Sequence, residues 1–198
     1  MTLVPISFEH IHQAVGKAIS TWAHVEESLA TLFAVSVSGV DLPDWNWRNA
    51  DLRAAKRAFW AIQAFDSKLK MTNEAAAFHL RKDRELRSEW SRIFNRLSEK
   101  KNKRNNLAHG SALMSTYMPF GEDKVQTRFI LQPSHGTWRD GSIKRDREWE
   151  QRKNHHLAPD AMMLDDIFQA ISEFARLSKE IDTLLDKMRP QGPPAPWQ

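Results

Sequence analysis

The feature that most constrains this chain is a set of long stripes of apolar residues at three- and four-residue steps. The clearest stripe runs from Met163 to Leu185, where seven apolar residues recur at the spacing of one helix face. Another spans residues 8–39 and ends at Gly39. Stripes of this length favour an all-α fold, because each helix must bury its apolar face against another helix.

The middle of the chain has the same spacing with one predicted interruption. Apolar residues follow a helical period over 52–69 and again over 86–97. Thr72 and Asn73 both suit the first position of a helix, so we predict a break near 71–73 with a new helix after it. Trp60 and Trp90 are expected to pack between helices.

After Gly110 the pattern changes from that of helices to that of strands. Residues 113–118 and 125–131 flank the turn sequence PFGED, which predicts a β-hairpin. We therefore predict an all-α bundle of four or five helices as a single domain over 1–189. A hairpin and polar insertion at about 111–156 precede the last helix, and the Pro-rich tail at 190–198 is expected to be disordered.

Composition excludes several classes of function. The chain has no Cys, which rules out disulfides, zinc–thiolate sites and thiol nucleophiles. No apolar run is long enough to span a bilayer, and the first residues lack the pattern of a signal peptide. We therefore expect a cytoplasmic protein that does not associate with membranes.

The charges are unevenly distributed although the net charge is only +4. Residues 81–104 carry ten Lys and Arg against four Asp and Glu, whereas residues 160–189 carry four against seven. A basic stretch beside an acidic helix fits either an anionic partner or self-association of the two segments. A DNA-binding regulator that uses 81–104 ranks last, because the chain shows no short helix–turn–helix pair.

The basic stretch ends in RNNLAHG at residues 104–110. Arg followed by His after four to six residues occurs at Arg104/His109 and at Arg128/His135, which is about the number expected by chance, roughly two. Context separates the two matches. Arg104 lies seven residues after Leu97, so it projects towards the core side near a helix end, whereas Arg128 and His135 fall in a strand and a loop.

RNNLAHG resembles the signature of the HEPN superfamily of helical-bundle proteins, in which Arg and a polar residue, most often Asn, precede His by four to six residues. The helix order over about 8–188, including WAHVEESL in the first helix, is also similar. The resemblance implies a metal-independent endoribonuclease with Arg104, Asn105 and His109 as catalytic residues. It also implies a homodimer, no metal or cofactor, and a toxin or phage-defence role with an antitoxin or other protein partner.

These residue types suit RNA cleavage by attack of the ribose 2′-OH. A histidine has an ordinary pKa near 6.5, so it can accept or donate a proton at neutral pH. An arginine fork binds two phosphate oxygens and stays charged, which stabilises the phosphorane. Asn105 can orient the histidine or the phosphate through its amide. The departure from the minimal bundle is the insertion at 111–156.

The alternative interpretation is an ordinary helix end. Basic residues complement the negative end of the helix dipole, and Gly110 is a common stop. In that case the chain is a non-catalytic helical adaptor that binds RNA, a nucleotide or a protein partner.

Other residues are secondary candidates. Glu26 in the first helix can pair with Arg104 across a bundle, or it lies on the wet face of that helix. Adjacent His155 and His156 lack the fixed spacing of metal ligands, so we expect no metal. The insertion mixes aromatic and basic side chains, which suits RNA by stacking and phosphate contact or else anchors a loop. The candidate substrate-binding residues are Lys101, Lys103, Trp138 and Arg145.

Overall fold

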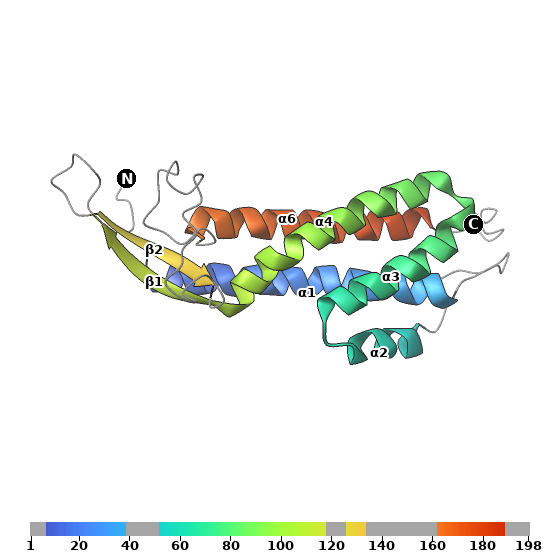
Figure 1. The fold of residues 1–198 in the computed structure, drawn as a ribbon, viewed down its shortest axis with the longest axis horizontal. Helices are drawn as coiled ribbons and strands as arrows, with labels where there is room; N and C mark the ends of the chain where they lie inside the picture. Colours follow the sequence, from blue (N-terminus) through green and yellow to red (C-terminus); the bar gives the residue numbers. More distant parts are fainter. Residues whose placement is uncertain (1–6, 39–51, 118–125, 134–161, 189–198) are drawn as a thin grey trace, which may run out of the picture. The chain divides into compact units, whose positions relative to one another are not determined.

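The computed structural model describes residues 7–38, 52–117, 126–133 and 162–188 (Figure 1). Within these ranges the chain is mostly helical, with five α-helices and one small hairpin, so the predicted all-α fold is confirmed. None of the described helices is long and apolar enough to cross a membrane. The elements in chain order are α1 (Phe8–Ser38), α2 (Arg53–Ala61), α3 (Phe65–His79), the 3₁₀ turn η1 (Leu80–Lys82), α4 (Arg84–His109), β1 (Gly110–Tyr117), β2 (Gln126–Pro133) and α6 (Leu164–Lys187).

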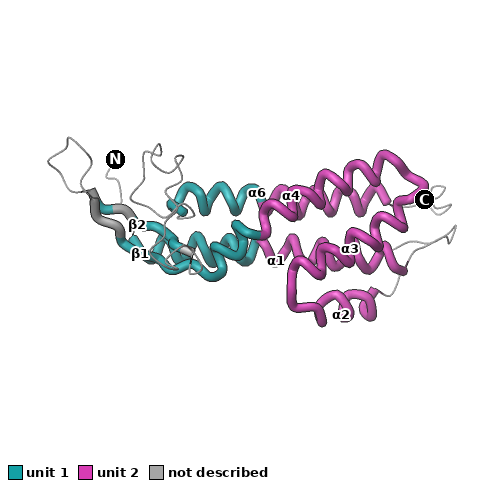
Figure 2. The backbone as a smooth tube through the Cα atoms, in the orientation of Figure 1, with its two compact units in different colours: residues 1–21, 102–173 teal, residues 22–101, 174–198 magenta. Residues whose placement is uncertain are grey.

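The chain divides into two compact units, which Figure 2 distinguishes by colour. Unit 1 comprises residues 1–21 and 102–173, and unit 2 comprises residues 22–101 and 174–198. Helices α1, α4 and α6 each contribute a segment to both units. The prediction of one domain over 1–189 stays a prediction.

Unit 2 is a bundle of segments from α1, α3, α4 and α6, with α2 packed against it. The ring of Trp22 in α1 meets Phe65 of α3 and Phe174 of α6 edge to face, with centroids 4.9 and 4.8 Å apart. Phe59 fixes α2 to this core by packing on Phe33 of α1. Burial of these large rings contributes to the hydrophobic stabilisation of the bundle.

The predicted break near 71–73 is wrong, because α3 runs through it. The hydroxyl of Thr72 donates to the carbonyl of Lys68 one turn earlier, and Asn73 accepts a hydrogen bond from the indole of Trp90. Both residues therefore make bonds within the bundle instead of capping a helix. The chain actually leaves the helical conformation at Ile62 and Ala64, and again at Asp83.

Unit 1 contains the predicted hairpin, which is confirmed. Strands β1 and β2 pair antiparallel from Gly110 opposite Pro133 to Tyr117 opposite Gln126, so β1 begins three residues earlier than expected. The backbone of Leu131 exchanges two hydrogen bonds, of 2.8 and 2.9 Å, with Met162 just before α6. These bonds fix β2 to the start of the last helix. The polar insertion beyond residue 133 and the tail at 190–198 lie outside the described residues.

The stripe in the last helix is also confirmed, since Ile167, Phe174 and Ile181 are buried along α6. Trp90 is buried as expected, whereas Trp60 is 44% exposed, although its ring packs against Nζ of Lys68 in α3 at 4.3 Å. Trp60 sits one position beyond Phe59 on the short helix α2, so only one of these two adjacent side chains can face the core.

Candidate functional site

The motif lies in the last turns of α4, which stays helical up to His109. Asp83 caps the start of this helix, because its Oδ1 accepts the backbone N–H groups of Glu85 and Leu86 at 3.0 Å. At the other end, Leu107 is buried and fixes the rotation of the last turns about the helix axis. The burial of one face determines where the polar motif side chains project.

The side chains of Arg104 and Asn105 are joined directly. Nη1 of Arg104 donates to Oδ1 of Asn105 at 3.2 Å. Arg104 is half-buried with its Nε shielded from solvent, in agreement with the predicted core-side projection, while Asn105 and His109 are exposed. Because Asn105 and His109 are four residues apart in one helix, they lie on the same face. The hydrogen bond to Asn105 thus holds the guanidinium of Arg104 near the helix face that carries His109.

Gly110 follows His109 and is the first residue of β1, so helix passes into strand without a loop. The expected helix stop at Gly110 is confirmed, because α4 ends at His109. A Cβ atom at this position would lie 2.7 Å from the backbone oxygen of Asn106 and 2.7 Å from Cγ of Leu131. The glycine is required for space, because β2 approaches the helix end closely.

The two lysines beside the motif make ion pairs within their units. Nζ of Lys103 lies 3.7 Å from Oε2 of Glu173 in unit 1. Nζ of Lys101 donates to Oδ1 of Asp66 at 2.7 Å in unit 2. These pairs reduce the positive field that each lysine offers to an anionic ligand. The prediction that both bind substrate remains a prediction.

Four other sequence candidates are not placed as side chains. Trp138 and Arg145 lie outside the described residues, as does His135. Arg128 is paired with Ser115 in the hairpin by backbone register alone. In the part of the chain that is described, no three His, Cys, Asp or Glu side chains are grouped so as to hold a metal ion.

Glu26 is only 8% exposed, so the interpretation that it lies on the wet face of its helix is wrong. Its Oε1 accepts the indole N–H of Trp22 at 3.0 Å and its Oε2 accepts Nζ of Lys68 at 2.8 Å. Glu26 belongs to unit 2 and Arg104 to unit 1. Support of Arg104 by Glu26 therefore stays a prediction.

Lys68 is the buried charged residue that sequence reasoning missed. It is 5% exposed on α3, and its neighbours on the same helix face, Leu69 and Thr72, are buried too. A lysine on the buried stripe of a helix is unusual unless it is paired. The place of Lys68 on the buried face of α3 was therefore the signal that the sequence offered. Its partner Glu26 could not be found in the same way, because it lies 42 residues away in the sequence.

Comparison with models of known protein families, with curated proteins and with solved structures gives no match. Any inference about function therefore depends on the residues and contacts described above.

Proposed function

We propose that this protein is a metal-independent endoribonuclease of HEPN type, with Arg104, Asn105 and His109 as its catalytic residues. The observation that carries the proposal is the hydrogen bond from Arg104 to Asn105 at the exposed end of α4, with His109 on the same helix face as Asn105. An ordinary helix end does not require an arginine to be hydrogen-bonded to an amide on the helix face that carries a histidine.

The proposed reaction follows from the chemistry of these groups. A base removes the proton of a ribose 2′-OH, and the oxygen attacks the adjacent phosphorus. The bond to the 5′-oxygen breaks as an acid protonates the leaving oxygen, so the products carry a 2′,3′-cyclic phosphate and a 5′-OH. His109 carries out proton transfer, either as the base or as the acid in these steps. The guanidinium of Arg104, oriented by Asn105, stabilises the charge on the phosphorane.

A homodimer is part of the proposal, because one chain supplies a single motif histidine. Two copies related by a two-fold axis would provide both an acid and a base. The expected result of analytical ultracentrifugation is a dimer at micromolar concentration. A strict monomer that still cleaves RNA would show that each chain acts alone.

The first test is RNA cleavage in EDTA by the wild type, His109→Ala and Arg104→Ala. His24→Ala and Arg87→Ala are matched controls, because both residues are exposed on α1 and α4 outside the motif. We expect the two motif variants to lose about 10²-fold or more in rate, as for loss of a general acid or base, and the controls to keep the wild-type rate. If all five proteins behave alike, these residues are not a catalytic site.

A second candidate function is a non-catalytic adaptor. The observation that favours it is that Lys101 and Lys103 are each engaged by a carboxylate, which weakens the case for these lysines as binders of an RNA substrate. The adaptor would bind RNA, nucleotide or protein without cleavage, and the measurement is binding at varied salt alongside the cleavage assay. If the nuclease proposal holds, its setting is a cytoplasmic toxin or phage-defence effector held in check by an antitoxin.

A further inference from the structure

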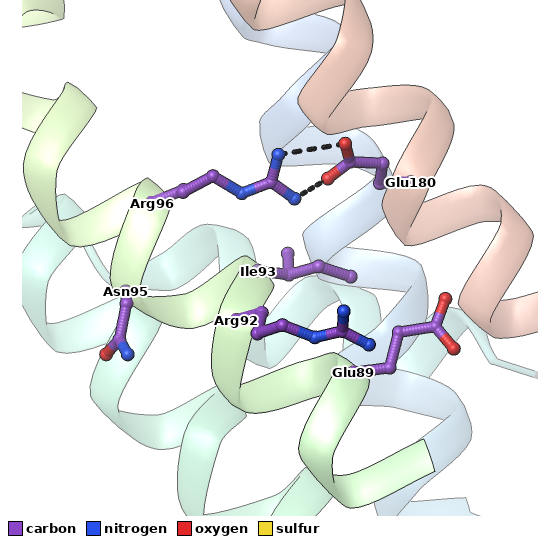
Figure 3. Close-up of a pocket in the computed structure, with 6 residues that line it drawn as sticks. All are labelled: Glu89, Arg92, Ile93, Asn95, Arg96 and Glu180. Carbon is purple, nitrogen blue, oxygen red and sulfur yellow. Dashed lines mark hydrogen bonds and ion pairs between the residues drawn. The ribbon is translucent and has the colours of Figure 1, made fainter. Parts of the chain in front are cut away.

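A surface groove lies between α4 and α6 within unit 2 (Figure 3). Figure 3 shows the side chains of Arg92 and Arg96 both extending from α4 towards the side of α6, whereas Asn95 points away. The groove is lined mainly by charged groups, with one buried apolar residue among them. Its lining residues are Glu89, Arg92, Ile93, Asn95, Arg96 and Glu180.

Both carboxylates of the groove are already engaged. Arg96 donates from its two terminal nitrogens to the two oxygens of Glu180, and the bond from Nη1 measures 2.9 Å. Nε of Arg176 lies 3.7 Å from Oε1 of the same carboxylate. Glu89 accepts Nζ of Lys187 at 2.7 and 2.9 Å. Neither carboxylate is therefore left to neutralise a further cation.

Arg92 is the cation without such compensation. No ion pair joins it to any carboxylate in the described ranges, and its side chain is exposed. Arg176, on α6, keeps 64% of its side chain exposed despite its contact with Glu180. Two guanidinium groups therefore remain accessible to a ligand: that of Arg92, which lines the groove, and that of Arg176, which contacts the lining residue Glu180.

The arginines also repel one another. Burial lowers the pKa of Arg96, and the positive charges of Arg176 and Arg92 lower it further, while Glu99 acts in the opposite direction. Two of these three guanidinium groups, Arg96 and Arg176, contact the carboxylate of Glu180, and Arg92 has no such contact. A bound anion would relieve this repulsion, and phosphate geometry matches the arginine fork.

We propose that the groove between α4 and α6 binds the phosphodiester backbone of a single RNA strand through Arg92 and Arg176, while Arg96 stays paired with Glu180. The choice of RNA as the ligand rests on the proposed function. The inference that the groove binds phosphate groups does not, because it follows from the arginines themselves. No aromatic side chain of the described residues lines the groove, so they offer no platform for a base there. Contacts of this kind position a strand without reading its sequence.

The test uses the double variant Arg92→Ala/Arg176→Ala, made in the His109→Ala background so that binding is measured without cleavage. The matched control is Arg57→Ala/Lys70→Ala, which removes the same charge from exposed positions in unit 2 outside the groove. Binding of a fluorescein-labelled single-stranded RNA is followed by anisotropy between 50 and 200 mM salt, a range of roughly the width used to count phosphate contacts. Circular dichroism verifies that each variant is folded.

We expect the groove variant to bind RNA about tenfold or more weakly, with the slope of log K against log salt shallower by about 1.4 for two lost single-strand contacts. The control should stay within about twofold of its parent. An equal loss in both variants would assign the effect to net charge and overturn the groove. Unchanged RNA binding by the groove variant would also overturn the groove proposal. Failure of the His109→Ala parent to bind RNA would overturn it as well.

Two further arms identify the ligand and keep the proposals separate. Inorganic phosphate or a mononucleotide that displaces labelled RNA as effectively as unlabelled strand would make the site one for small anions and overturn the strand assignment. Weak binding by the groove variant with no cleavage by the wild type supports the groove and removes the nuclease. Cleavage by the wild type together with normal RNA binding by the groove variant supports the nuclease and overturns the groove.

Discussion

Nζ of Lys68 in α3 lies 2.8 Å from Oε2 of Glu26 in α1, and both side chains are buried. The other oxygen of Glu26 accepts the indole N–H of Trp22, and Nζ of Lys68 lies 4.3 Å from the centre of the Trp60 ring. The pair is thus satisfied by hydrogen bonds and by an aromatic face. It links α1 with both α2 and α3 in the core of unit 2.

The first prediction concerns this pair. Lys68→Met leaves the carboxylate of Glu26 buried without its cation, so the free energy of unfolding should fall by about 3–5 kcal/mol. The double variant Glu26→Gln/Lys68→Met removes both charges and retains an acceptor for Trp22. Most of the loss should then be recovered, as urea denaturation would measure. A single variant that is as stable as the double would contradict the coupling.

The second prediction concerns the close approach at the end of α4. Gly110→Ala places a methyl group against backbone, which cannot move aside, so stability should fall by about 1–3 kcal/mol. Gly16→Ala is the control, because nothing lies within 4 Å of its added Cβ, and it should gain about 0.5–1 kcal/mol in helix α1. Thermal unfolding would measure both. Equal effects would show that Gly110 is replaceable.

The third prediction tests the link between Arg104 and Asn105 and depends on the nuclease proposal. Asn105→Ala removes the acceptor that orients the guanidinium, so the cleavage rate should fall by about tenfold, the value of one hydrogen bond. Asn105 is exposed, so stability should change by less than about 0.5 kcal/mol. Asn102→Ala, at another exposed position of α4, should cleave like the wild type. A dead Asn102→Ala variant would count against a role specific to Asn105.

The fourth prediction concerns α2, which is fixed to the bundle by Phe59. Phe59→Ala should lower the free energy of unfolding by about 3–5 kcal/mol and expose the amides of Arg53–Ala61 to rapid hydrogen exchange. Trp60→Ala, at an exposed neighbouring position, should cost far less. If exchange in α2 stayed slow in the Phe59 variant, another contact would have to hold this helix.

The helices were predictable because residues such as Ile167, Phe174 and Ile181 repeat at the period of one buried face, which is a local signal. The break at 71–73 was misplaced for the opposite reason. Thr72 and Asn73 favour caps by local chemistry, but the partner of Asn73 is Trp90, 17 residues away. A tertiary hydrogen bond of this kind overrides local preference and leaves no trace in the spacing.

The same distinction between local and long-range signals applies to the candidate sites. Arg104, Asn105 and His109 are close in sequence, so helix geometry alone places them together. The groove could not be found in this way, because Arg96 and Glu180 are 84 residues apart. Glu26 and Lys68 pose the same problem, and only packing shows that both are buried. Sequence spacing reveals sites within one helix and misses those built between helices.

The direct passage from His109 to Gly110 has a consequence for how this protein can change in length. Side chains of a strand alternate between its two faces, so one residue added or removed at this junction would exchange the faces of β1 along Gly110–Tyr117. A residue added within the last turn of α4 would instead turn the part of the chain that follows it by about 100°, a single helical step. Natural or engineered insertions and deletions should therefore be excluded from this point, whichever function the motif serves.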